Sequence, residues 1–93
     1  MATLGTSPAD VRTRFGLRLK ELRREAGFKT ARSFAQVLNM QENRYTRYER
    51  GEVEPNLFNI GKMCRLLGVD ANRLSGLTDN FEGPTSRQGK AHQ

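Results

Sequence analysis

The 93-residue sequence is poor in the groups on which several protein classes depend. Its one cysteine, Cys64, cannot form an intramolecular disulfide, which excludes a disulfide-stapled secreted scaffold. The chain also has one histidine, which excludes a zinc site of the usual cysteine and histidine type, so we expect no metal and no cofactor. No apolar run approaches the roughly 20 residues of a membrane-spanning helix, and no secretory signal pattern begins the chain. We therefore expect a cytoplasmic protein with no membrane partner.

The sequence also lacks the motifs that would indicate an enzyme. We identify no pair of buried carboxylates, no nucleophile with a neighbouring base and no glycine-rich phosphate loop. What the chain has is positive charge, with 16 Lys and Arg against 10 Asp and Glu. Residues 12–50 carry eleven basic and four acidic residues, whereas residues 51–93 carry five of each. The basic half fits a polyanionic partner, although on charge alone a solvated, charged helix face is the favoured interpretation.

The spacing of apolar residues predicts five short helices. Phe15, Leu19, Leu22 and Ala26 form one stripe of a helix that starts at about Asp10 and ends before Gly27. Further helices are predicted after a Thr30 cap, from residue 41 or 42 to 50, after an Asn56 cap and after an Asp70 cap. We therefore predict a compact all-α domain over residues 10–78, with a flexible arm at 1–9 and a disordered tail at 79–93.

The most informative segment is residues 30–49, which predicts two short helices joined by a tight turn. Ala35 is small enough for two helices to cross closely, and Asn39 is one of the few residues that tolerate a left-handed turn conformation. Tyr45 is placed to dock the second helix on the first. On this segment alone, a helix-turn-helix and an ordinary pair of antiparallel helices remain equally possible.

The chain from Phe15 to Leu77 resembles the lambda-repressor-like helix-turn-helix family, which includes the phage repressors, Cro and the Xre-type regulators. The resemblance rests on Leu22-Arg23, Gly27, Phe34-Ala35, Leu38, Tyr48-Glu49-Arg50-Gly51, Pro55, Leu57, Leu67-Gly68-Val69 and Leu74. The sequence departs from the family pattern at Asn39, where glycine is usual, and at Gln41, where serine or threonine commonly caps the third helix. It also has one extra residue between Gly27 and Ala35, and an acidic loop containing Glu52 and Glu54, which is expected to weaken phosphate contacts.

The resemblance implies that the third helix lies in the major groove of DNA. The expected base-contacting residues are Gln41, Glu42, Asn43, Arg44 and Arg47. Asn43 suits adenine and Arg47 suits guanine, while Glu42 either accepts from cytosine or favours the positive end of the helix dipole. The expected phosphate-contacting residues are Lys29, Thr30, Ala31, Arg32, Thr46 and Arg50.

The resemblance also implies an ion pair, a dimer and a function. Arg23 and Glu49 are expected to form an ion pair that links the first helix to the third and sets its angle. A homodimer on a palindromic operator is expected through Leu57, Ala71, Arg73 and Leu74, and it is expected to be weak or to form only on DNA. The function implied is a repressor-like transcriptional regulator of bacterial or phage type that acts by operator occupancy. The alternative is a protein-binding module, such as an antitoxin or adaptor, built on the same fold.

Overall fold

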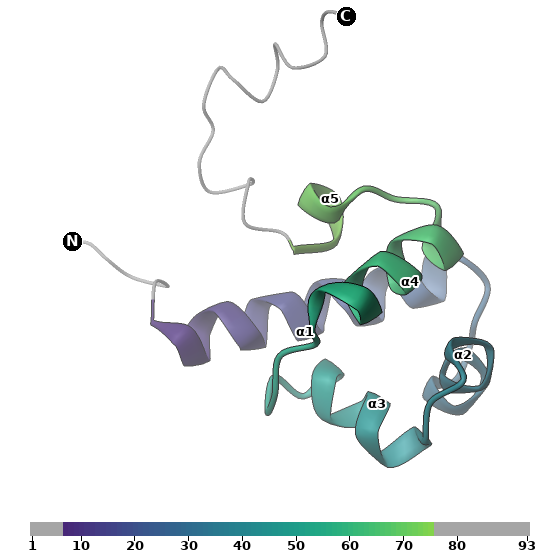
Figure 1. The fold of residues 1–93 in the computed structure, drawn as a ribbon, viewed down its shortest axis with the longest axis horizontal. Helices are drawn as coiled ribbons and strands as arrows, with labels where there is room; N and C mark the ends of the chain where they lie inside the picture. The colour runs from purple at the N-terminus through teal and green to yellow at the C-terminus, as the bar shows by residue number, and fades with distance from the viewer. Residues whose placement is uncertain (1–6, 76–93) are drawn as a thin grey trace, which may run out of the picture.

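The computed structural model describes residues 7–75, and every regular element in that range is a helix. The expected all-α class is therefore confirmed. In chain order the elements are α1 (Pro8–Glu25), α2 (Ala31–Leu38), α3 (Glu42–Glu49), α4 (Leu57–Leu67) and α5 (Ala71–Ser75) (Figure 1). The expected tail at 79–93, residues 1–6 of the expected arm, and Leu77 lie outside the described residues.

The first helix begins earlier than its apolar pattern predicts. Ser7 caps α1 by accepting a hydrogen bond from the backbone amide of Asp10 at 3.1 Å, and Pro8 occupies the first helical turn. Proline suits this position because the first amides of a helix have no intrahelical partner. Residues 7–9 therefore belong to the helix and its cap, and the expected boundary between an arm and a domain at Asp10 is wrong there.

The longest helix, α1, packs directly on two of the other helices. Helices α3 and α5 pack on α1, α2 packs on α3, and α4 packs on α5. The fully buried side chains come from every helix, with Leu19, Phe34, Tyr45, Met63 and Leu74 among them. Burial of each such side chain stabilises the fold by roughly 1.5–3 kcal/mol. The core is therefore one cluster, and it joins the predicted helix-turn-helix segment to the rest of the domain.

Ala26, which belongs to the predicted apolar stripe, and two other apolar residues lie outside the fully buried core. Ala26 lies at the C-terminal cap of α1 and is exposed, and Leu57 at the start of α4 is exposed as well. Cys64 is half-buried against the core. Its partial burial raises the pKa of its thiol, and the negative charge of Asp70 adds a smaller increase. Each of these residues lies at a helix end or at the margin of a stripe, where side-chain spacing constrains burial least.

Helix ends follow the sequence closely. Thr30, Asn56 and Asp70 each accept a hydrogen bond from the amide three residues later, at 3.1, 2.8 and 2.8 Å. Asn39 adopts the left-handed conformation at φ 63°, as the tight turn requires, and Gln41 makes no side-chain cap at the start of α3. The caps were predictable because each depends on a few neighbouring residues.

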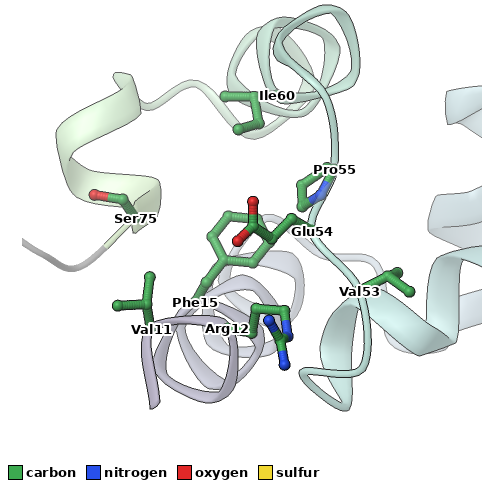
Figure 2. Close-up of a pocket in the computed structure, with 8 residues that line it drawn as sticks. All are labelled: Val11, Arg12, Phe15, Val53, Glu54, Pro55, Ile60 and Ser75. Carbon is green, nitrogen blue, oxygen red and sulfur yellow. The ribbon is translucent and has the colours of Figure 1, made fainter. Parts of the chain in front are cut away.

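A pocket of about 190 Å³ opens between α1, the loop after α3, α4 and α5 (Figure 2). Its apolar lining includes Val11, Phe15, Pro55 and Ile60. Small-molecule sites typically occupy about 300–1,000 Å³, so we do not take this pocket as the functional site. No helix in the described part of the chain combines the length and apolar character needed to cross a membrane.

Candidate nucleic-acid interface

Helix α3 has one face inside the protein and one face outside it. Tyr45 and Tyr48 are buried, and the Tyr45 ring meets the Phe34 ring of α2 edge to face, with centroids 5.4 Å apart. The outward side carries all five residues expected to contact bases, and all five are exposed: Gln41, Glu42, Asn43, Arg44 and Arg47. Figure 1 shows α3 at the margin of the fold, beside α2. The helix thus presents a polar, arginine-rich surface to solvent.

The N-terminus of α2 supplies a second part of this surface. Thr30 caps it through Oγ1, and the side chains of Lys29 and Arg32 are exposed. Ala31 is half-buried, so any contact it makes with a phosphate would use its backbone amide. The first amides of a helix point away from it and attract anions. The structure therefore brings a helix N-terminus and two cations to one end of α2.

The remaining expected phosphate contacts lie on α3 itself. Thr46 is half-buried, and its hydroxyl donates to the Asn43 carbonyl at 3.1 Å. Arg50 caps the C-terminal end of α3 and is exposed. Arg50 is thus accessible to a backbone phosphate, whereas the Thr46 hydroxyl is already engaged within its own helix.

A buried ion pair holds the inner side of α3. Arg23 Nε lies 2.7 Å from Glu49 Oε2, and the two side chains are only 4% and 10% exposed. Arg23 also donates through Nη1 to the Phe28 carbonyl at 2.9 Å, and the Tyr45 hydroxyl donates to Glu49 Oε2 at 2.5 Å. The expected pair is therefore present. Two groups missing from the expectation, the Tyr45 hydroxyl and the Phe28 carbonyl, complete its hydrogen bonding.

The pKa values of this cluster reflect its burial and its charges. Burial alone would lower the pKa of Arg23, but the hydrogen-bonded Glu49 carboxylate more than offsets it, and the net pKa is raised. Burial raises the pKa of Tyr45, and the hydrogen bond that Tyr45 donates to Glu49 raises it further. The arginine therefore stays charged and the phenol stays neutral in the physiological pH range.

Close backbone packing reinforces the same contact. Gly16 of α1 is buried against the Tyr48 and Glu49 carbonyl oxygens, and a β-carbon at position 16 would lie 2.7 Å from the Tyr48 oxygen. Only glycine permits this approach, which sequence reasoning missed. The available signal was an isolated glycine inside a strong helical pattern.

The outer face of α3 carries ion pairs of a different kind. Glu52 Oε1 lies 3.3 Å from Arg47 Nε, and Glu52 Oε2 lies 3.5 Å from Arg50 Nη1. At the other end of α3, Glu42 lies 3.8 Å from Arg32 of α2. All of these side chains are exposed. Glu52 was expected only to weaken phosphate contacts through its charge, but it also contacts Arg47 and Arg50, two of the predicted DNA-binding residues.

The expected dimer residues divide into two groups. Leu57, Ala71 and Arg73 are exposed, and Arg73 Nη2 lies 3.5 Å from Glu25 of α1. Leu74 is 0% exposed because its side chain fills the core. Its assignment to a dimer contact is therefore wrong, since the monomer already covers it. Phe58, 71% exposed beside the 83% exposed Leu57, enlarges the apolar surface at the start of α4.

The geometry described so far defines a helix-turn-helix unit, and comparisons with known proteins agree. A family model described as a helix-turn-helix domain matches residues 14–77. The control protein C.MunI of Mycoplasma sp is 32% identical over 65 residues, which is 70% of this chain and 88% of that protein. The SPbeta prophage-derived uncharacterized HTH-type transcriptional regulator YonR of Bacillus subtilis (strain 168) is 37% identical over 60 residues. That alignment covers 64% of this chain and 55% of the relative, so the chain spans about half of its length.

The chain belongs to the helix-turn-helix family and is a DNA-binding transcriptional regulator. The family match covers α2 and α3 entirely, together with most of α1 and all of α4 and α5.

Proposed function

We propose that the protein recognises a specific double-stranded DNA sequence with α3 in the major groove and acts as a repressor by occupying its operator. The observation that carries this proposal is the pairing of an exposed, arginine-rich outer face on α3 with a buried ion pair behind it. Because the ion pair holds the inner side of α3 to α1, the outer side chains can meet base edges in a fixed orientation. Occupation of an operator would then exclude polymerase, or contact it, without a ligand or a catalytic step.

Base readout is assigned to the exposed side chains at the start and middle of α3. The Asn43 amide suits the two hydrogen-bonding groups of adenine, and the Arg47 guanidinium suits those of guanine. Each such bidentate pair contributes roughly 1–3 kcal/mol of discrimination. Gln41, Glu42 and Arg44 are placed to contribute further contacts at the same edge.

Phosphate contacts are assigned to the N-terminus of α2 and to Arg50. The free amides beside Thr30, with Lys29 and Arg32, form an anion site at one end of the helix-turn-helix. Arg50 extends the basic surface past the other end of α3. Such contacts fix the position of the protein on the duplex and make binding depend on salt, because each one releases condensed counterions.

A homodimer on a palindromic operator completes the proposal. One domain reads about half a site, and two domains would place their helices roughly 34 Å apart on one side of the duplex. Leu57 and Phe58 are the largest exposed apolar side chains near the start of α4, with exposed Ala71 and Arg73 as further candidates. This small patch is consistent with a dimer that is weak or that assembles on DNA. Sedimentation of wild type and Leu57→Ser, with and without duplex, tests the assignment.

Selection of bound sequences from a pool of random duplexes tests the proposed function directly. We expect a palindromic consensus, a steep loss of affinity with added salt, and a reduced base preference in Arg44→Ala and Arg47→Ala. Arg65→Ala is the matched control, because it removes the same charge from an exposed position on α4. If Arg44→Ala and Arg47→Ala keep the wild-type affinity and consensus, α3 does not read the groove and the proposal fails.

A further inference from the structure

The C-terminal end of α3 fixes the position of Glu52 relative to Arg47. Gly51 adopts the left-handed conformation at φ 77°, and its amide donates to the Tyr48 carbonyl at 3.1 Å. The amide of Glu52 then donates to the Arg47 carbonyl at 3.0 Å. These two hydrogen bonds form a Schellman motif, in which the amide of the residue after the left-handed one donates to a carbonyl in the last turn of the helix.

The side chain of Glu52 approaches the same residue as its backbone does. In many Schellman motifs the corresponding two side chains make an apolar contact. Here they are oppositely charged, with Arg47 Nε 3.3 Å from Glu52 Oε1. The other carboxylate oxygen lies 3.5 Å from Arg50 Nη1. Because the backbone is anchored, this contact is built into the helix end and does not depend on a free loop finding its partner.

The contact engages one edge of the Arg47 guanidinium. It uses Nε, whereas a guanidinium has five N–H donors, and its terminal Nη nitrogens are able to donate in parallel to a guanine edge. A carboxylate behind an arginine therefore restricts where its terminal nitrogens lie without using them. In the proposed complex the same carboxylate would add negative charge to the DNA-facing surface, which would weaken binding to any duplex.

We propose that Glu52 is a positioning residue that holds Arg47 for base readout and so raises sequence discrimination while lowering affinity for duplex in general. The inference rests on the proposed function, in which Arg47 contacts a base. The next acidic residue in the loop offers an internal comparison. Glu54 carries the same charge, but its side chain lines the pocket with Phe15 and Ile60, and Figure 2 shows it there between α1 and α4.

The test uses the full chain and a duplex carrying the consensus selected with the wild type. Affinity is measured for this duplex, for its single-base-pair variants and for a scrambled duplex of equal length. Arg47→Ala first identifies the base pair that Arg47 reads, where discrimination should fall about 5- to 100-fold. At that base pair, Glu52→Gln should lower discrimination about two- to fivefold, the range expected for loss of an exposed ion pair.

Two controls separate positioning from charge. Glu54→Gln removes the same charge from the same loop, so it should raise affinity for the scrambled duplex as Glu52→Gln does, but leave discrimination unchanged. In the Arg47→Ala background, Glu52→Gln should no longer alter the preference at that base pair. If Glu52→Gln and Glu54→Gln affect discrimination equally, or if neither changes it, Glu52 acts through charge alone and the inference fails. If Arg47→Ala instead leaves discrimination unchanged at every base pair, Arg47 reads no base and the proposed function itself fails.

Discussion

Arginine and glutamate pair on both sides of α3, yet the two sides differ in depth and geometry. On the inner side, Arg23 Nε and Glu49 Oε2 lie 2.7 Å apart, and the two side chains are 4% and 10% exposed. On the outer side, Arg47 and Glu52 lie 3.3 Å apart and remain about half-exposed. If one member of a buried ion pair is removed, the other is left in the interior as an unpaired charge. An exposed pair exchanges its partner for water or phosphate at little cost. The same two residue types thus serve as a fixed joint on one side and as a replaceable contact on the other.

Breaking the inner pair should produce the largest effect. Arg23→Met leaves the Glu49 carboxylate buried without its cation, and we expect a loss of about 3–5 kcal/mol in the free energy of unfolding. Urea denaturation measures this loss. The double variant Arg23→Met with Glu49→Met removes both charges and should recover much of it. A stable Arg23→Met single variant with unchanged DNA affinity would show that the pair neither supports the fold nor sets the angle of α3.

The close approach between α1 and α3 should give the next largest effect. Gly16→Ala places a β-carbon against the carbonyl oxygens of Tyr48 and Glu49, so α3 has to shift. Alanine normally stabilises a helix over glycine by about 1 kcal/mol, but we expect this change to destabilise by roughly 1–3 kcal/mol because of overpacking. Gly61→Ala is the matched control within α4, where the nearest atom lies 3.8 Å from the added carbon. In thermal unfolding, the midpoint temperature should fall for Gly16→Ala and rise for Gly61→Ala.

The Tyr45 phenol should make the free energy of unfolding depend on pH. The raised pKa of Tyr45 means that the folded state keeps the proton when the unfolded state has lost it. The stabilising contribution is therefore complete below about pH 10, the ordinary pKa of tyrosine, and is lost as the pH rises above it. Above pH 10 we expect the free energy of unfolding to fall by up to about 1.4 kcal/mol per pH unit. Tyr45→Phe should remove the part of this pH dependence that comes from Tyr45, while the half-buried Cys64 thiol, whose pKa is also raised, contributes equally to wild type and variant.

Breaking the outer pair should have the smallest effect on stability. Glu52→Gln is expected to change the free energy of unfolding by less than about 0.5 kcal/mol, because its partners are exposed and screened by salt. Chemical denaturation at low and moderate ionic strength checks this value. A loss comparable to that of Arg23→Met would remove the distinction between the two sides of the helix.

The features that sequence reasoning predicted well depend on short stretches of chain. The caps at Thr30, Asn56 and Asp70 and the left-handed Asn39 follow from a few adjacent residues. The pairing of Arg23 with Glu49, 26 residues apart, came from family resemblance, because periodicity says nothing about which charged residues meet. The exposure of Asn43 and Arg47 followed from placing Tyr45 and Tyr48 on the buried face.

The features that were missed depend on how distant segments pack. Leu74 is apolar and near the end of the domain, so its sequence context does not reveal whether it fills the core or faces a partner. The fit of Gly16 against α3 requires the relative placement of two helices. The contact between Glu52 and Arg47 requires the backbone path after Gly51. Pro8 and Ser7 were different, since their helix-start signal was local and was overlooked.

The division of α3 into residues that face inward and residues that face outward has a consequence for how the protein acquires new targets. Asn43, Arg44 and Arg47 belong to no part of the core, whereas Tyr45, Tyr48 and Glu49 belong to it or to its buried ion pair. Substitutions at the first set can accumulate without eroding the architecture that displays them. Divergence toward a different operator, whether natural or engineered, is therefore open at those three positions while the scaffold stays constant.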